Sequence, residues 1–327
     1  MLRQSADGMV THIFESLALD GLVHAVFTRL GGVSREPFAT LNVGRHATTG
    51  DRAHDDGAAV SENHARIYAH LGLTAERVVS PHQVHSNRVT RAGVQDSGRV
   101  VPSTDGLVTD TPGLALLLRF ADCQPIILYD PVNHALGIIH AGWRGVAQAI
   151  ARRAVETMQE TFGTRPQDLI AGLGPAIGPC CYTVGHNVAS AMGYALPDWS
   201  QVMSIEENGW RFDLPVANAQ QLFAAGVRKI EQAHLCTACR NDEFFSHRAD
   251  MGRTGRFAVV AYLKARIGEE GADTSRARDA SLGRGTVQTD ERAETHPAEV
   301  EFGGSTQPHS LHPPGLPAFQ ELLGGGP

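Results

Sequence analysis

Three apolar segments followed directly by an amphipathic helix constrain the fold more than any other feature of the sequence. The segments cover residues 114–120, 126–129 and 136–140, and each reads as a short strand. A helix is expected over residues 145–162, because its apolar side chains fall on one stripe: Val146, Ile150, Ala154, Val155, Met158 and Phe162. Strands combined with a helix in this way predict a mixed α/β or α+β fold.

A turn between the second and third segments predicts which residues meet at one end of the sheet. The turn is Asp130-Pro131-Val132-Asn133-His134. If the flanking segments pair as an antiparallel hairpin, residues whose numbers sum to about 263–265 lie opposite one another. Cys123 and His140 would then lie side by side, just before a helix start whose free N–H groups favour anions.

The last part of the 327-residue chain differs in composition from the rest. Residues 268–327 hold ten acidic residues against four arginines, and therefore six of the seven net negative charges. They contain sixteen glycines or prolines but only nine Ile, Leu, Val or Phe residues, too few to offset the entropy lost on ordering. We expect a single catalytic domain over residues 1–267 and a disordered acidic, Gly/Pro-rich tail over 268–327, with a short helix at 316–323 as the alternative for the tail.

Charge and hydropathy exclude two classes of partner. No block of Lys or Arg is present of the kind that nucleic-acid binders use. The apolar runs of the chain, residues 114–118 among them, are far shorter than the roughly 20 residues that cross a bilayer. The first residues also lack the apolar stretch of a signal peptide. We therefore expect a cytoplasmic protein with no nucleic-acid or membrane partner, whose five cysteines are reduced.

Cys123 has three interpretations. It can be a small buried apolar residue, since free cysteine is often buried. It can be a nucleophile that the imidazole of His140 deprotonates. It can also be a metal ligand, because thiolate and imidazole together suit zinc. His82 and His85 are the candidates for a third ligand, and three protein ligands would leave a coordination position open for water or substrate.

The other cysteines are Cys180-Cys181 and the pair Cys236-Thr237-Ala238-Cys239. Together they could form a four-thiolate zinc site, although adjacent cysteines are awkward ligands for one metal. A thioredoxin-like redox role is disfavoured because residues 216–231, which precede the second pair, read as a helix and not as a strand. The favoured interpretation is four free thiols.

Several motifs occur in an order and spacing that resemble a known family. The most specific are Gln83-Val84-His85, Ala121-Asp122-Cys123-Gln124-Pro125, His140-Ala141-Gly142-Trp143-Arg144-Gly145 and Gly174-Pro175-Ala176-Ile177-Gly178. Supporting segments are residues 27–34, 41–44, 236–237, 244–248 and 254–256. Over residues 12–265 the chain resembles a bacterial cytoplasmic member of the purine nucleoside phosphorylase family formerly described as multicopper polyphenol oxidoreductases (laccases).

The resemblance implies a zinc ion held by His85, Cys123 and His140. It implies phosphorolysis of adenosine, inosine, guanosine and methylthioadenosine, together with adenosine deamination. The implied fold has layered mixed β-sheets with packed helices and is shared with bacterial cysteine-dependent deamidase toxins, and some bacterial members are linked to peptidoglycan precursor editing. The chain departs from the family pattern at Thr183, where relatives usually carry Glu, and at His247, where the usual residue is bulky or basic.

Three further residues are candidates for binding substrate. Phosphorolysis needs a phosphate dianion, and Arg29 beside Gly31-Gly32 is the first choice to bind it, with Arg144 at the predicted helix start as the second. Either arginine could instead be a surface or packing residue. Asn42 could orient the ribose or cap a turn.

The sequence thus predicts a zinc-dependent purine nucleoside phosphorylase with adenosine deaminase activity, whose partners are purine nucleosides and phosphate. A metal-free Cys–His hydrolase or deamidase linked to peptidoglycan editing is the main alternative. A copper polyphenol oxidase is less favoured, because such oxidases need several clustered coppers and this chain supplies one three-ligand set. A non-enzymatic partner of cell-wall machinery whose metal only stabilises the fold is the remaining alternative.

Overall fold

The computed structural model of the chain describes residues 1–44, 54–207 and 209–266. Residues 1–265 form one compact unit. The predicted tail at 268–327, and the alternative helix within it, lie outside the described residues. Among the described helices, none is both long enough and apolar enough to cross a membrane.

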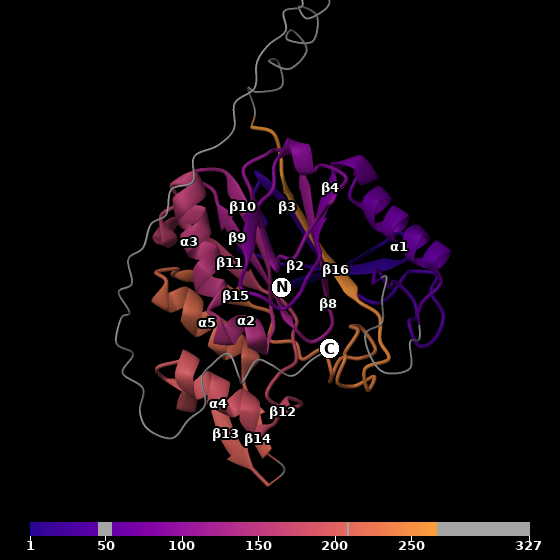
Figure 1. Cartoon of the computed structure of the whole chain (residues 1–327). Helices are drawn as coiled ribbons and strands as arrows, with labels where there is room; N and C mark the ends of the chain where they lie inside the picture. The colour runs from indigo at the N-terminus through magenta and orange to yellow at the C-terminus, as the bar shows by residue number, and fades with distance from the viewer. Residues whose placement is uncertain (45–53, 208, 267–327) are drawn as a thin grey trace, which may run out of the picture. The chain divides into compact units, whose positions relative to one another are not determined.

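Two large mixed sheets make up the centre of the fold (Figure 1). The seven-stranded sheet has the order β1 (Leu2–Ala6), β2 (Met9–Ile13), β3 (Leu22–Phe27), β16 (Phe257–Leu263), β8 (Ala115–Phe120), β4 (Val78–Pro81) and β6 (Val100–Val101). The six-stranded sheet has the order β15 (Lys229–Gln232), β11 (Ile170–Leu173), β9 (Gln124–Asp130), β10 (Ala135–Ala141), β7 (Gly106–Thr109) and β5 (Val89–Arg91). A small third sheet has the order β12 (Thr183–Val184), β14 (Gly209–Phe212) and β13 (Met203–Glu206).

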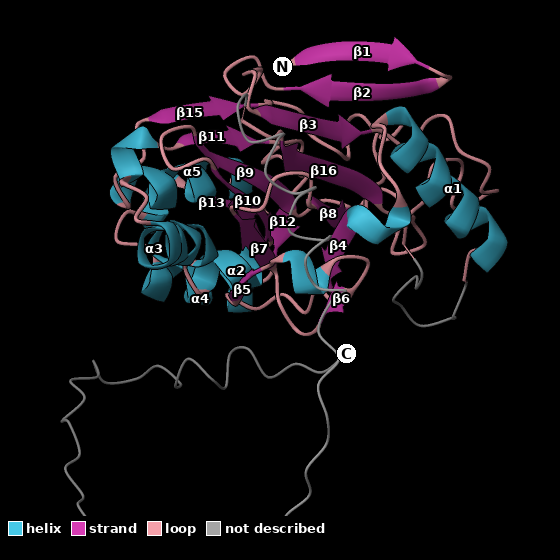
Figure 2. Cartoon of the chain, turned by 90° about the horizontal axis from the view of Figure 1, so that it is seen from above, coloured by secondary structure: helices cyan, strands magenta, loops and turns pink. Residues whose placement is uncertain are grey.

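Helices cover the outer faces of the two large sheets (Figure 2). On one side is α1 (Gly57–His70), and on the other are α3 (Ile150–Phe162) and α5 (Leu214–Ala224). The remaining helices are α2 (Trp143–Ala147) and α4 (His186–Ala195), with short 3-10 turns at Ala75–Arg77, Val94–Asp96, Pro166–Asp168 and Trp199–Gln201. The result is a layered α+β architecture, which confirms the predicted fold class.

Alternation along β9 explains the two cores on either side of the six-stranded sheet. Ile127 and Tyr129 belong to the core that it shares with the seven-stranded sheet. Ile126 and Leu128 point to the other face, where they pack with α3. All four residues are at most 3% exposed, so this strand is buried on both faces and its register is strongly fixed.

The predicted hairpin of β9 and β10 is present. The pairs run from Ala135 opposite Asp130 to Ala141 opposite Gln124, so paired residue numbers sum to 265. The Asp130 carboxylate accepts hydrogen bonds from the N–H groups of Val132 (2.9 Å) and Asn133 (3.0 Å), which closes the turn.

The predicted helix over residues 145–162 is wrong in one respect, because it is two helices. Ala149, between α2 and α3, has a left-handed backbone with φ of 58°. The buried stripe of Ile150, Ala154, Val155 and Met158 lies on α3 as expected. The sequence has neither Gly nor Pro at the break, so the pattern alone does not reveal it. Because α2 has only five residues, its dipole attracts an anion less than the dipole of the long helix that was expected at this position.

The helix predicted over residues 216–231 is also shorter than expected. Helix α5 ends at Ala224, and strand β15 follows at Lys229–Gln232. A strand therefore does precede Cys236, contrary to the sequence interpretation.

Candidate metal centre and active site

Three residues from distant parts of the chain meet at one end of the six-stranded sheet. His85 lies in the loop after β4, Cys123 lies between β8 and β9, and His140 is near the end of β10. Their ligand atoms all lie within 4.8 Å of one another. The two imidazole rings meet edge to face, with centroids 4.9 Å apart. His82, the other histidine considered, is exposed and is not part of this group.

The hairpin register brings Cys123 to His140 as expected, with a detail that the sequence does not give. His140 pairs with Pro125, so Cys123 lies just beyond the last pair of the ladder, opposite Gly142. A Cβ atom on Gly142 would lie 2.6 Å from Sγ of Cys123. Glycine is therefore required at this position so that the thiol can approach the backbone directly after β10 closely.

Asp105, which the sequence analysis missed, organises two of the three residues. Its Oδ1 lies 2.9 Å from Nδ1 of His140 and accepts the backbone N–H of His85 at 2.9 Å. Its Oδ2 accepts the backbone N–H of Ser86 at 2.6 Å and the Ser86 hydroxyl at 2.8 Å. The carboxylate thereby holds the loop that carries His85. His85 itself has a left-handed backbone conformation in this loop, with φ of 60°. The signal in the sequence is an acidic residue directly before the apolar strand 106–109.

The protonation states of these groups are linked. Burial raises the pKa of the Cys123 thiol, but the charge and hydrogen bonds of His140 and His85 more than offset it and bring the pKa down to about 5. Burial lowers the pKa of His140, but Cys123 and Asp105 overcome this effect and raise the pKa to about 9. Burial also raises the pKa of Asp105, and His140 and Ser86 reverse this and lower the pKa to about 2. Such shifts are typical of functional sites.

Positively charged side chains lie within electrostatic reach of Cys123. Burial lowers the pKa of Arg256, and the Cys123 thiolate counteracts it. Burial, with a further contribution from Cys123, raises the pKa of Tyr182, while Arg248 and Arg144 act against this rise. The guanidinium carbon of Arg248 lies 5.4 Å from the centre of the Tyr182 ring. Positive charge from Arg256 therefore acts on the thiol, in a region that also holds the Asp122 carboxylate.

The guanidinium group of Arg29 is held by neighbouring residues. It donates to the Ala39 carbonyl (2.8 Å) and to the carbonyl and side-chain oxygens of Asn241 (2.8 and 3.1 Å), and it stacks on Phe245. Its side chain is 12% exposed.

Asn42 is 1% exposed and organises a turn. Its Oδ1 accepts the N–H groups of Gly44 and Arg256, both at 2.8 Å, and its Nδ2 donates to Asp55 at 2.8 Å. The half-buried Arg144 lies on α2, with its guanidinium carbon 4.6 Å from the centre of the Trp143 ring.

The two departures from the family pattern have different surroundings. Thr183 is on β12 opposite Arg211. Burial and the neighbouring Arg256 lower the pKa of His247, while Asp122 and Cys123 act against this effect. His247 is therefore within electrostatic reach of the thiol.

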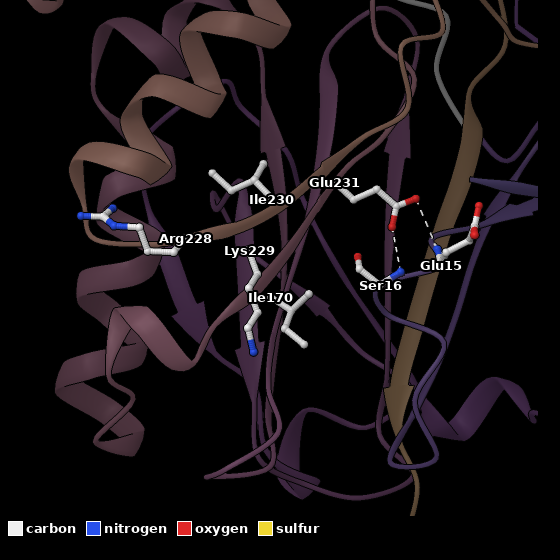
Figure 3. A pocket seen from close by; sticks show the side chains of 7 residues that line it. All are labelled: Glu15, Ser16, Ile170, Arg228, Lys229, Ile230 and Glu231. Carbon is white, nitrogen blue, oxygen red and sulfur yellow. Dashed lines mark hydrogen bonds between the residues drawn. The ribbon is translucent and has the colours of Figure 1, made fainter.

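An open pocket of about 690 Å³ lies elsewhere on the six-stranded sheet (Figure 3). Its lining residues are Glu15, Ser16, Ile170, Arg228, Lys229, Ile230 and Glu231. Because Ile170 pairs with Tyr129, the pocket is near the end of β9 that is remote from Cys123. It shares no residue with the three-residue group.

The fold and the site define a class: a layered α+β protein in which two histidines and a cysteine that could hold a metal ion meet at one end of a sheet. Residues 23–264 match the family described as "Multi-copper polyphenol oxidoreductase laccase". The chain belongs to this family, and the resemblance drawn from its motifs is confirmed.

Relatives with assigned names match over most of their length. The protein named purine nucleoside phosphorylase YlmD of Geobacillus stearothermophilus is 41% identical over 257 residues, which cover 75% of this chain and 91% of the relative. A purine nucleoside phosphorylase of Deinococcus radiodurans is 37% identical, and the match covers 76% of this chain and 92% of the relative. The chain is thus a member of an enzyme family in which relatives are named purine nucleoside phosphorylases.

Solved structures agree with this assignment. The crystal structure of YlmD from Geobacillus stearothermophilus matches with a TM-score of 0.74 and 37% identity, and covers 80% of this chain and 98% of that chain. The crystal structure of the hypothetical protein YfiH of Bacillus licheniformis matches with a TM-score of 0.73 and 36% identity. The match covers 80% of this chain and 99% of that chain.

Proposed function

We propose that this protein is a cytoplasmic, zinc-dependent purine nucleoside phosphorylase that also deaminates adenosine. Its substrates would be adenosine, inosine, guanosine or methylthioadenosine with phosphate, and its phosphorolysis products the free base and ribose 1-phosphate. The observation that carries the proposal is the convergence of His85, Cys123 and His140 within 4.8 Å, in a chain 41% identical to a protein named purine nucleoside phosphorylase.

The donor set fits zinc. Two imidazoles and one thiolate are ligands that zinc prefers, and three protein ligands are typical of a catalytic site with an open position. The carboxylate of Asp105 on His140 is the partner that orients histidine ligands of zinc. When bound, zinc supplies a Lewis acid and lowers the pKa of water. A multicopper oxidase fits less well, because the other cysteine cluster among the described residues offers four thiolates and no imidazole.

The chain's own residues would bind and orient the substrate. Phosphorolysis requires a dianion next to the anomeric carbon, and guanidinium groups bind phosphate with two parallel hydrogen bonds. Arg144 is the preferred phosphate ligand, because its charge acts in the same region as Cys123, whereas the guanidinium of Arg29 already donates to the carbonyls of Ala39 and Asn241. Arg248 and Arg256 would add positive charge there. Deamination needs no phosphate and would use the same ligand set without the anion site.

A second function is favoured by one observation. Cys123, His140 and Asp105 form a connected series of thiol, imidazole and carboxylate, as in cysteine-dependent hydrolases. In that alternative the His140 imidazole would take the thiol proton, Asp105 would hold the imidazolium, and Cys123 would attack a carbonyl carbon without a metal.

Metal analysis and turnover assays separate the two functions. The purified protein should carry zinc, and His85→Ala, Cys123→Ala and His140→Ala should each lower both zinc content and nucleoside turnover. His82→Ala is the matched control, since His82 is an exposed histidine of the same loop outside the ligand set. Turnover is measured by chromatography with and without phosphate. Full activity in metal-free Cys123→Ala protein would overturn the zinc proposal, and a covalent adduct on Cys123 during turnover would favour the hydrolase.

A further inference from the structure

A second group of metal-ligating side chains lies outside the site described above. It consists of the four remaining cysteines of the chain, and their Sγ atoms all lie within 4.8 Å of one another: Cys180, Cys181, Cys236 and Cys239. Two of the sulfur pairs, Cys180 with Cys239 and Cys181 with Cys239, are 3.4 Å apart. All four thiols are free, and two of them are exposed to solvent.

Parallel pairing of two strands explains why cysteines so far apart in sequence meet. β11 and β15 are parallel neighbours, so the loops that follow them leave the same edge of the sheet (Figure 1). Ala176 and Cys236 form a bridge between these loops, and the N–H of Thr237 donates to the Ala176 carbonyl at 3.0 Å. The two loops are thus held in register with no contribution from the thiols.

The objection that adjacent cysteines are poor ligands for one metal is removed by the turn that carries them. The N–H of Cys181 donates to the Gly178 carbonyl at 3.0 Å, which folds the chain back on itself. In this turn Cys180 and Cys181 both place their sulfur 3.4 Å from Sγ of Cys239. Both side chains therefore face the same point.

The spacing matches a zinc tetrathiolate. With Zn–S bonds of about 2.3 Å, the sulfur atoms of a regular tetrahedron are about 3.8 Å apart. The distances of 3.4 Å and the upper bound of 4.8 Å lie on either side of that value. Small side-chain rotations would then suffice to complete the geometry.

The surroundings suit a negatively charged cluster. The backbone N–H of Gly178 donates to Sγ of Cys236 at 3.3 Å, a contact that stabilises a thiolate ligand. Arg211 donates to the Pro179 carbonyl at 2.6 Å, and Arg248 donates to the Cys181 carbonyl at 3.2 Å. The guanidinium group of Arg211, which also pairs with Glu206, and that of Arg248 therefore lie beside the four sulfurs, where they offset part of the negative charge of a tetrathiolate.

We infer that these four cysteines bind a second zinc ion, which joins the loop after β11 to the loop after β15. Each thiol gives its proton to solvent when the metal binds, and no oxidant is needed. The site is structural, because four protein ligands leave no open coordination position.

The second site is connected to the active site through Asp122. Asp122 accepts the hydroxyl of Thr237 (2.7 Å) and the N–H of Arg248 (2.7 Å), and its carbonyl accepts the N–H of Ile177 (2.9 Å). Both cysteine loops therefore hold the residue directly before Cys123. Metal in the second site would fix the position of that backbone segment.

Metal counting in variants of the full chain tests the inference. Cys123→Ser removes one ligand of the first site and leaves the four-cysteine cluster intact, so this protein should retain about one zinc per chain by mass spectrometry. Adding Cys236→Ser and Cys239→Ser should remove that zinc. Loss of all metal in the Cys123→Ser protein, with four thiols that react freely or pair as disulfides, would overturn the inference.

Cobalt substitution gives a readout in protein that retains all four cysteines of the cluster. Cobalt(II) added to metal-free Cys123→Ser protein should give the intense thiolate-to-cobalt charge-transfer bands and the visible bands of a tetrahedral tetrathiolate. Cys180→Ser in the same background should weaken the charge-transfer bands by about a quarter, since one of four Co–S bonds is lost. A cobalt spectrum without thiolate bands in protein that retains all four cysteines would refute the site. This result does not depend on the reaction at Cys123, so the proposed function is tested separately.

Discussion

Oδ1 of Asp105 lies 2.9 Å from Nδ1 of His140, and this contact determines which ring nitrogen faces Cys123. Because the ionised carboxylate can only accept, the proton of the pair is on Nδ1, and Nε2 is left for the thiol or for a metal. The same carboxylate holds the backbone of the loop that carries His85. One buried residue therefore orients two of the three candidate ligands.

Asp105→Asn should weaken the metal site without removing any ligand. The amide is neutral and has only one acceptor oxygen, so it cannot replace the charged carboxylate that holds both His140 and the loop N–H groups. We therefore expect metal affinity or turnover to fall about 10- to 100-fold. Affinity is measured by competition with a chromophoric chelator. Asp110→Asn is the control, because Asp110, directly after β7, makes an exposed pair with Arg91. Equal affinity in both variants would contradict the role assigned to Asp105.

Gly142→Ala should displace the thiol of Cys123. The added Cβ would lie 2.6 Å from Sγ, which is closer than real contacts allow. Relief of such overpacking costs about 1–3 kcal/mol, and we expect both a lower melting temperature and a lower metal content. Gly193→Ala is the matched control, because a Cβ there meets nothing within 4 Å. A Gly142→Ala protein with full metal content would show that the site tolerates the shift.

Two arginine variants should differ in the products that they form from adenosine. Losing one charge-assisted contact to phosphate costs about 1.5–3 kcal/mol, or roughly ten- to a hundred-fold in phosphorolysis. Arg144→Ala should therefore slow release of adenine and raise the phosphate requirement, while inosine formation changes much less. Arg29→Ala should instead lower stability, because its guanidinium holds Ala39 and Asn241.

The measurement is the ratio of adenine to inosine over a phosphate titration, at known zinc content. A selective loss of adenine release in Arg29→Ala would return the phosphate site to Arg29. Equal loss of both products in Arg144→Ala would mean that Arg144 holds the nucleoside.

His24 should make the fold sensitive to mild acid. Burial lowers the pKa of His24 to about 4, and its Nε2 accepts the N–H of Phe14 at 2.8 Å, which requires the neutral ring. In the unfolded chain this residue binds a proton near pH 6.5. The free energy of unfolding is therefore at its full value above that pH and declines as the pH falls toward 4. The decline that His24 contributes should reach about 2 kcal/mol by pH 5.

Urea unfolding at pH 7.5 and pH 5 checks this expectation. His24→Gln retains an acceptor for Phe14 but has no charge to gain, so its stability should depend less on pH. His82→Gln, at an exposed histidine, should keep the wild-type dependence. The same pH dependence in the His24 variant would show that other groups cause it.

The sequence by itself determined the local elements and the residues that form the candidate site. The turn at 130–134 predicted the β9–β10 hairpin, because turn chemistry and apolar runs act over a few residues. That hairpin brought Cys123 to His140, and the family motifs supplied His85. The break at Ala149 was missed because no glycine or proline marks it.

Only the tertiary structure decided what depends on pairing between distant segments. Asp105 reaches His140 because β7 pairs with β10, and an isolated Asp before a strand does not reveal that neighbour. Cys180 and Cys236 meet because β11 and β15 are parallel neighbours, whereas the sequence pattern placed a helix where β15 lies. Local periodicity indicates which face of a segment is buried, but not which other segment it pairs with. Pairing depends on which arrangement of all the segments buries their apolar faces together.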